Sequence, residues 1–217
     1  MSFKKQIEFL KELQKNNNKE WMDVNRKWYK EVRDEYIGWL NSMNTRLSNI
    51  DDGYYDTPGK KAINRINNNL MFHPNRPVYK DHFGAGFDKK PKTADFYFEL
   101  GIDRCIFAGG LWRPEPKVLR SVRDAIDYDG ENLEKILNKK SFKTRFDGLY
   151  EDVKLTNAPK GYNKDNQFIE LLKNRTFAVF QEFSTKETNK NNFDDQLIDA
   201  YKEMLPFRRY LNKAITV

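Results

Sequence analysis

The stretch DFYFELGIDRCIFAGGLWRPEP (residues 95–116) decides the fold class. Its first part alternates apolar residues with more polar neighbours, the period-two pattern of a half-buried strand. The apolar positions are Phe96, Phe98 and Leu100. Residues 105–108 predict a partner strand, and Asp103-Arg104 lie at the turn between the two. Two strands joined by so short a connection pair antiparallel.

The second part of the same stretch predicts a change from strand to helix. Gly109-Gly110 are expected to break the second strand, and Pro114-Glu115-Pro116 to open a helix, because proline is favoured in a first helical turn. Apolar residues at helical spacing follow: Val118, Leu119, Val122 and Ile126. Residues 131–137 predict a short further helix.

Upstream, the strongest periodic pattern predicts a long amphipathic helix near the N-terminus, capped by Asn18 and running to Leu47. Its apolar side reads Trp21, Val24, Trp28, Val32, Tyr36, Leu40, Met43 and Leu47. A first helix is expected over residues 3–14. The asparagines at 16–18 interrupt the two, because asparagine competes with helical hydrogen bonding. Residues 62–66 predict a short strand.

Downstream, residues 168–172 predict a short helix and residues 176–183 a strand. A C-terminal helix is expected over residues 193–211, bent or broken near Pro206. The sequence contains no internal repeat and no linker. We therefore predict a single α+β domain over residues 1–217, with an antiparallel sheet packed with helices.

Composition narrows the function classes. The net charge of +7 comes from 39 basic and 32 acidic residues spread along the chain, a distribution typical of a solvated surface. Nucleic-acid binding is kept as an alternative, on the basic-aromatic stretches 26–30 and 208–210. A protein-interaction module without catalysis is a second alternative. No apolar run reaches membrane-spanning length, and one cysteine suits a reducing compartment, so a cytoplasmic protein is expected.

A polar stretch holds the candidate site, INRINNNLMFHPNRPVYKDHFGAGF (residues 63–87). It contains both histidines of the chain, and imidazole is the side chain that titrates near neutral pH, so His73 or His82 would act as a general base. The residues expected to hold a small anionic ligand here are Arg65, Asn68, Arg76, Tyr79 and Lys80. The alternative is that the asparagines cap turns and the histidines satisfy loop carbonyls.

Trp112 and Arg113, in the turn of residues 109–115, are expected to complete the pocket with a stacking face and a cation. Gly84-Ala85-Gly86 lacks the third glycine of a phosphate loop and predicts a bend beside a strand. Cys105 predicts a buried structural thiol. No metal site is assigned, and the sequence indicates neither a cofactor nor an oligomeric state.

These motifs resemble a bacterial and fungal family of conserved hypothetical proteins, a domain of unknown function of about this length. The resemblance spans residues 3–175 and rests on several groups of residues. They are Asn16-Asn17, Trp21, Arg26, Arg65-Ile66, Phe72, Tyr79-Lys80, His82-Phe83-Gly84, Gly109-Gly110-Leu111-Trp112, Pro114-Glu115-Pro116 and Pro159-Lys160-Gly161-Tyr162.

The centre of the family pattern reads approximately R-I-x-R-D-x-R-F-S-x-D-K-x-P-Y-K, and this chain departs from it at charged positions. Asn68-Asn69, Met71 and Asn75-Arg76 replace charged residues of the pattern, and Val78 replaces a proline. Either this chain belongs to a branch with altered chemistry, or those charges organise the loop. The resemblance implies a fold and a site location but no activity.

Overall fold

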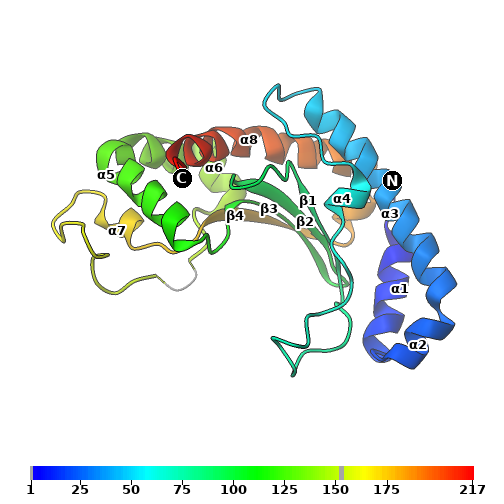
Figure 1. The fold of residues 1–217 in the computed structure, drawn as a ribbon. Coiled ribbons are helices and arrows are strands. Elements are labelled where there is room, and N and C mark those ends of the chain that lie inside the picture. Colours follow the sequence, from blue (N-terminus) through cyan, green and yellow to red (C-terminus); the bar gives the residue numbers. More distant parts are fainter. Residues whose placement is uncertain (1, 152–153) are drawn as a thin grey trace. The chain divides into compact units, whose positions relative to one another are not determined.

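The computed structural model describes residues 2–151 and 154–217 and has an α+β architecture with an antiparallel sheet, as predicted (Figure 1). Four strands pair in the order β1-β2-β3-β4. Contacts group the chain into two compact units. The first unit comprises residues up to 89, 97–107 and 182–198, and the second comprises 90–96, 108–181 and 199–217.

The first unit begins with three helices, α1 (Lys4–Lys15), α2 (Lys19–Val24) and α3 (Arg26–Ser48). Asn18 caps α2 as predicted, because its Oδ1 accepts a hydrogen bond from the Trp21 backbone N–H at 2.8 Å. The prediction of one helix from 18 to 47 is wrong at Asn25, which has φ −95° and ψ 16°. The Asn25 amide donates to the Trp21 carbonyl at 2.9 Å and so competes with helix continuation.

Aromatic side chains form the core of the first unit. The indole of Trp39 packs edge-on against Phe3, with ring centroids 5.0 Å apart, and its Nε1 donates to Asp194 Oδ1 at 2.9 Å. Trp39 is buried, whereas Trp21 and Trp28 are half-buried. Edge-to-face ring contacts stabilise such a core beyond the burial of area alone.

Residues 62–66 do not form the predicted strand. The helical turn α4 (Gly59–Ala62) ends there, and Ile63 makes only an isolated antiparallel bridge to Ala85. The bend predicted at residues 84–86 is also wrong, because these residues lie inside β1 (Phe83–Phe87). Gly84 allows a close approach in this strand: a Cβ there would lie 2.6 Å from the Tyr97 hydroxyl.

The hairpin of β2 (Asp95–Leu100) and β3 (Arg104–Leu111) confirms the central sequence prediction. The strand break expected at residues 109–110 is wrong, because β3 continues through both glycines. A Cβ on Gly109 would lie 2.1 Å from Met204 Sδ, and one on Gly110 2.2 Å from the Phe177 carbonyl oxygen. The glycines therefore serve close packing inside the strand.

In the second unit, α5 (Pro116–Asn138) starts with proline at N1, as predicted. The separate helix expected over 131–137 is its continuation beyond a kink at Asp129, where φ is −141° and ψ is 44°. The remaining elements are α6 (Lys140–Phe146), α7 (Ile169–Leu172), β4 (Phe177–Ser184), the single-turn η1 (Glu187–Asn189) and α8 (Phe193–Ala214). α8 continues through Pro206 without a break.

Within the part of the chain that the structure describes, none of the helices combines the length and the apolar character that crossing a bilayer requires.

Candidate functional site

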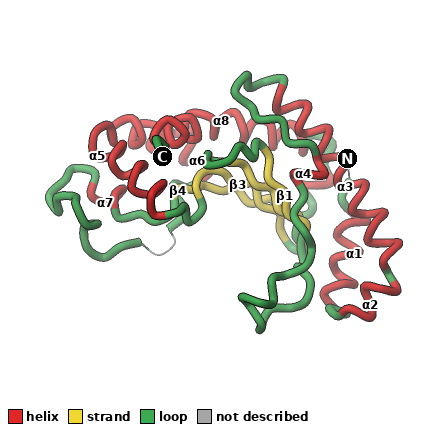
Figure 2. The backbone as a smooth tube through the Cα atoms, in the orientation of Figure 1, coloured by secondary structure: helices red, strands yellow, loops and turns green. Residues whose placement is uncertain are grey.

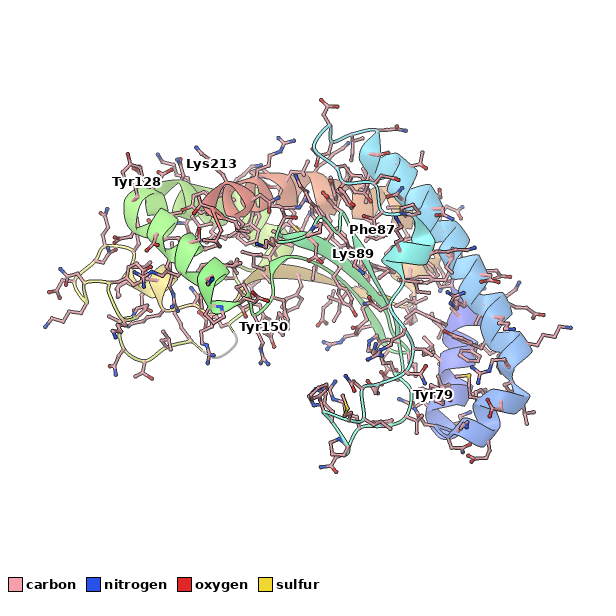
Figure 3. The ribbon with its side chains drawn as sticks, in the orientation of Figure 1. Tyr79, Phe87, Lys89, Tyr128, Tyr150 and Lys213 are labelled. Atoms are coloured by element: carbon pink, nitrogen blue, oxygen red, sulfur yellow. The ribbon has the colours of Figure 1, made fainter. Side chains whose placement is uncertain are left out.

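Residues 63–82 form a two-stranded ribbon, here called the hairpin arm, which extends away from β1 (the green loop at the bottom of Figure 2). Its two sides pair at the Asn67–Tyr79 bridge, and Lys80 N–H donates to the Ile66 carbonyl at 2.8 Å. Tyr79, labelled in Figure 3, lies on the second side of the arm. Asn17, from the turn between α1 and α2, anchors the arm here: its side chain accepts from the Tyr79 N–H at 2.9 Å and donates to the Tyr79 carbonyl at 3.0 Å.

The tip of the arm is exposed and partly apolar. Met71 is 79% and Phe72 69% accessible, and Leu70 is also exposed. His73 is exposed there too, and its backbone N–H closes a turn onto the Asn69 carbonyl at 3.0 Å. His73 therefore lies at the tip, away from the fixed side chains of the arm's base.

The charges of two arginines act on Lys80: Arg65 at the base of the arm, and Arg76 in the turn near its tip, where its N–H donates to the His73 carbonyl at 3.1 Å. Lys80 is half-buried and its Nζ donates to the Arg65 carbonyl at 2.7 Å. The pKa of Lys80 is lowered, first by burial and then by the positive charges of Arg65 and Arg76, while Glu99 acts in the opposite direction. Among the described residues, neither arginine has an ion-pair partner. Three of the residues predicted to hold an anion thus interact through their charges.

His82 is fixed between two carboxylates beside these cations. Its Nδ1 lies 3.1 Å from Asp81 Oδ1, and its Nε2 lies 3.5 Å from Glu99 Oε2. The Tyr97 hydroxyl donates to the same Glu99 oxygen at 2.8 Å. Burial, and then the charge of Glu99, raise the pKa of Tyr97 far above its ordinary value, so the phenol keeps its proton. Such a chain of hydrogen-bonding groups fixes the positions of the Glu99 carboxylate and the His82 ring.

Two other predicted ligands of the arm have structural roles. The Asn68 backbone N–H donates to the Val78 carbonyl at 3.0 Å and its side-chain amide to the Pro77 carbonyl at 2.9 Å. This is the turn-satisfying role that the alternative interpretation gave to the asparagines. Tyr79 is 4% exposed, so its ring belongs to the core.

Trp112 and Arg113 belong to the second unit, at the turn between β3 and α5. Trp112 is 57% exposed, its ring centroid lies 5.1 Å from that of Tyr150, and the Arg113 guanidinium carbon lies 5.5 Å from it. Arg113 has a positive φ of 44°, which is strained for a residue with a side chain. A pocket shared by this turn and residues 65–83 stays a prediction, because the two stretches belong to different units.

A cavity of about 530 Å³ lies beside this turn within the second unit. Its lining residues are Arg113, Pro114, Pro116, Leu119, Arg120, Arg123, Lys160, Tyr162 and Arg175. Of these, only Arg113 was predicted as a site residue. Arg120 and Arg123 share one face of α5 by their spacing, but the chain folding that brings Lys160 and Arg175 to that face has no sequence signal.

Sequence reasoning also missed Tyr97 and Glu99. The signal was present, because residues two apart in a strand point to the same face. The sequence pattern does not determine the strand register, and the register places the face of Tyr97 and Glu99 beside His82. No cluster of three or more potential metal-ligating side chains occurs in residues 2–151 and 154–217.

The two basic-aromatic stretches that suggested nucleic-acid binding are partly used in packing. Trp28 contacts Phe9 edge-on at 5.2 Å. Arg208 is 4% exposed, donates from Nε to the Ala94 carbonyl at 2.6 Å and lies 4.8 Å from the Phe96 ring. Its guanidinium is therefore part of the second unit's interior.

A comparison with known protein families matches residues 5–210 to the model of a conserved hypothetical protein family, DUF2461. No curated protein and no solved structure matches the chain. The chain therefore belongs to the DUF2461 family, in agreement with the resemblance seen in its motifs.

Proposed function

We propose that this protein binds a small anionic ligand at the base of the hairpin arm and carries out proton transfer on it. The observation that carries the proposal is the half-buried Lys80, whose Nζ donates to the Arg65 carbonyl at 2.7 Å and whose charge interacts with Arg65, Arg76 and the Glu99 carboxylate that His82 contacts. In this proposal the two arginines grip the anion through their planar forks, and Lys80 adds a point charge.

Electrostatics supports an anion at this position. The lowered pKa of Lys80 means that the folded protein disfavours its protonated form, in part because of Arg65 and Arg76. A bound anion would offset the repulsion among the three cations and raise the pKa of Lys80 again. Binding at alkaline pH would therefore be accompanied by proton uptake.

His82 is the proposed general base. Its side chain is 24% exposed, and Nε2, which lies 3.5 Å from Glu99 Oε2, is the less closely contacted ring nitrogen and would take the proton. Asp81 and Glu99 contact the two ring nitrogens and so orient the ring for proton transfer. The Tyr97 phenol donates to Glu99 and keeps that carboxylate in place. His73 remains a proposed second base, located at the tip of the arm.

The binding step is tested with a panel of small anions (inorganic phosphate, citrate, malate and acetate) by calorimetry at fixed ionic strength. Arg65→Gln with Arg76→Gln should weaken binding by about tenfold or more, since hydrogen bonds to charged groups contribute about 1.5–3 kcal/mol. Both side chains are exposed, so stability should be unchanged. The matched control is Lys27→Gln with Lys30→Gln, two exposed cations of α3.

The proton-transfer step is tested with His82→Asn in a screen for deuterium exchange into bound anions. The variant should retain binding within about twofold and lose exchange. If the arginine variant and the lysine control lose the same amount of affinity, the loss reflects the net charge of the protein, and the proposed binding site is refuted. Unchanged exchange in His82→Asn would remove His82 from the proposed role.

A further inference from the structure

The cavity at the start of α5 is a cationic pocket separate from the hairpin arm, and it is here called the arginine pocket. Five of its nine lining residues are cations: Arg113, Arg120, Arg123, Lys160 and Arg175. None of the lining residues that the structure describes is acidic. Like charges around about 530 Å³ repel one another, and an anion that enters the pocket relieves this repulsion.

The carboxylate of Asp124 lies near the pocket and interacts with two of its lining residues, Tyr162 and Arg120. Asp124 accepts a hydrogen bond from the Tyr162 hydroxyl at 2.6 Å, and its other oxygen lies 3.9 Å from Arg120 Nε. Burial and the Asp124 carboxylate raise the pKa of Tyr162, so the phenol stays neutral and its oxygen stays fixed. Asp124 thereby positions Tyr162, and it forms no ion pair with Arg123 or Arg175.

Arg123 gives the sharpest indication of a missing partner. It is half-buried, and its Nη2 donates to the Asn174 carbonyl at 3.0 Å. Its Nε is buried and has no hydrogen-bond partner among the residues that the structure describes. Burial, and then the charge of Arg175, lower the pKa of Arg123 while Tyr162 opposes them. Neither arginine forms an ion pair with the described residues, so no acidic side chain among residues 2–151 and 154–217 offsets this desolvation.

Backbone geometry adds to the positive potential. The 23-residue helix α5 begins at Pro116, which lines the pocket, so the positive end of its dipole lies there. The strained φ of Arg113 places this arginine in the turn just before the helix, where its N–H lies 3.4 Å from Thr176 Oγ1. Residues in such strained backbone conformations are held by the surrounding structure and cluster at functional sites.

The dimensions of the pocket indicate more than a bare ion. Its volume of about 530 Å³ is that of a small-molecule site, and Pro114, Pro116 and Leu119 give it an apolar wall. Arginine forks match the geometry of phosphate oxygens. We propose that the arginine pocket binds a phosphomonoester, with its phosphate held by Arg120, Arg123 and Arg175 and a small organic group against the prolines and the leucine.

The experiment measures binding of glycerol 3-phosphate, inorganic phosphate and citrate to the full chain by calorimetry at fixed ionic strength. Glycerol 3-phosphate should bind more tightly than inorganic phosphate, and citrate should bind weakly. Arg120→Gln with Arg175→Gln should weaken binding of glycerol 3-phosphate by about tenfold or more, since each removes a charge-assisted hydrogen bond. These two exposed arginines are chosen because Arg123 is half-buried.

The matched control, Lys117→Gln with Lys140→Gln, removes the same charge from exposed positions outside the pocket lining and should change affinity by less than twofold. Equal losses in the two double variants, equal affinity for citrate, or no binding of either phosphate compound at millimolar concentration would each overturn the proposal. Arg65→Gln with Arg76→Gln should leave this binding intact, so failure at the arginine pocket is distinguishable from failure at the hairpin arm.

Discussion

Substituting Gly110 tests the close packing at the end of β3. Gly110 has φ +120°, and a Cβ there would lie 2.2 Å from the Phe177 carbonyl oxygen and 2.9 Å from Ala178 Cα, both backbone atoms. Backbone strain at such a φ costs about 1–3 kcal/mol, and overpacking adds about 1–3 kcal/mol because a backbone neighbour cannot rotate away. Gly110→Ala should therefore lower the free energy of unfolding by about 2–6 kcal/mol.

The free energies of unfolding are measured by urea unfolding. Two further glycines, substituted in the same assay, separate the cost of backbone strain from the cost of overpacking. Gly148 has φ +94°, but a methyl group added there would have no atom within 4 Å, so Gly148→Ala should show the strain alone, about 1–3 kcal/mol. Gly38 lies inside α3 with open space around it. Because alanine is more favourable than glycine in a helix, Gly38→Ala should raise the free energy of unfolding by about 1 kcal/mol. If Gly110→Ala costs no more than Gly148→Ala, the packing argument for β3 is refuted.

Three more predictions concern buried or desolvated groups. Burial raises the pKa of Cys105 to about 11, so its thiol should react with a disulfide reagent at pH 8 far more slowly in the native state than in urea. Because the pKa of Cys105 is raised in the folded state, the neutral thiol contributes to stability at pH values below its ordinary pKa near 9. This contribution is lost as the pH rises toward 11, which unfolding measured as a function of pH would show. Asn44→Ala removes a side chain that makes hydrogen bonds to Tyr54, Asp56 and Thr57, and should cost about 2–4 kcal/mol in thermal unfolding; no loss would contradict its structural role. Because the folded pKa of Lys80 is lowered, wild type should gain stability relative to Lys80→Met as pH rises toward 10.5, and a pH-independent difference would contradict the desolvation of Lys80.

Much of the fold followed from local patterns. The period-two alternation of residues 96–100 gave the β2–β3 hairpin, and the proline at residue 116 gave the start of α5. The errors occur where long-range packing decides. Gly109 and Gly110 read as a strand break because glycine is unfavourable in strands, but in the protein they admit Met204 and the Phe177 backbone.

The candidate site divides in the same way. The sequence predicted a site from the cations and histidines of residues 65–82, because they are close along the chain, and one hairpin holds this stretch. It could not give Tyr97 and Glu99, whose position beside His82 depends on sheet register.

Residue type and short-range spacing therefore determined the elements and the composition of the hairpin arm, because those properties depend on neighbours within a turn or two. Only the tertiary structure decided the arginine pocket. Arg123 is separated from Lys160 and Arg175 by many residues of chain, and their charges act together only after α5 and the segments around residues 160 and 175 have packed. This packing places the cations around one cavity, and the half-buried Arg123 is affected most, since a charge removed from water interacts strongly with its neighbours.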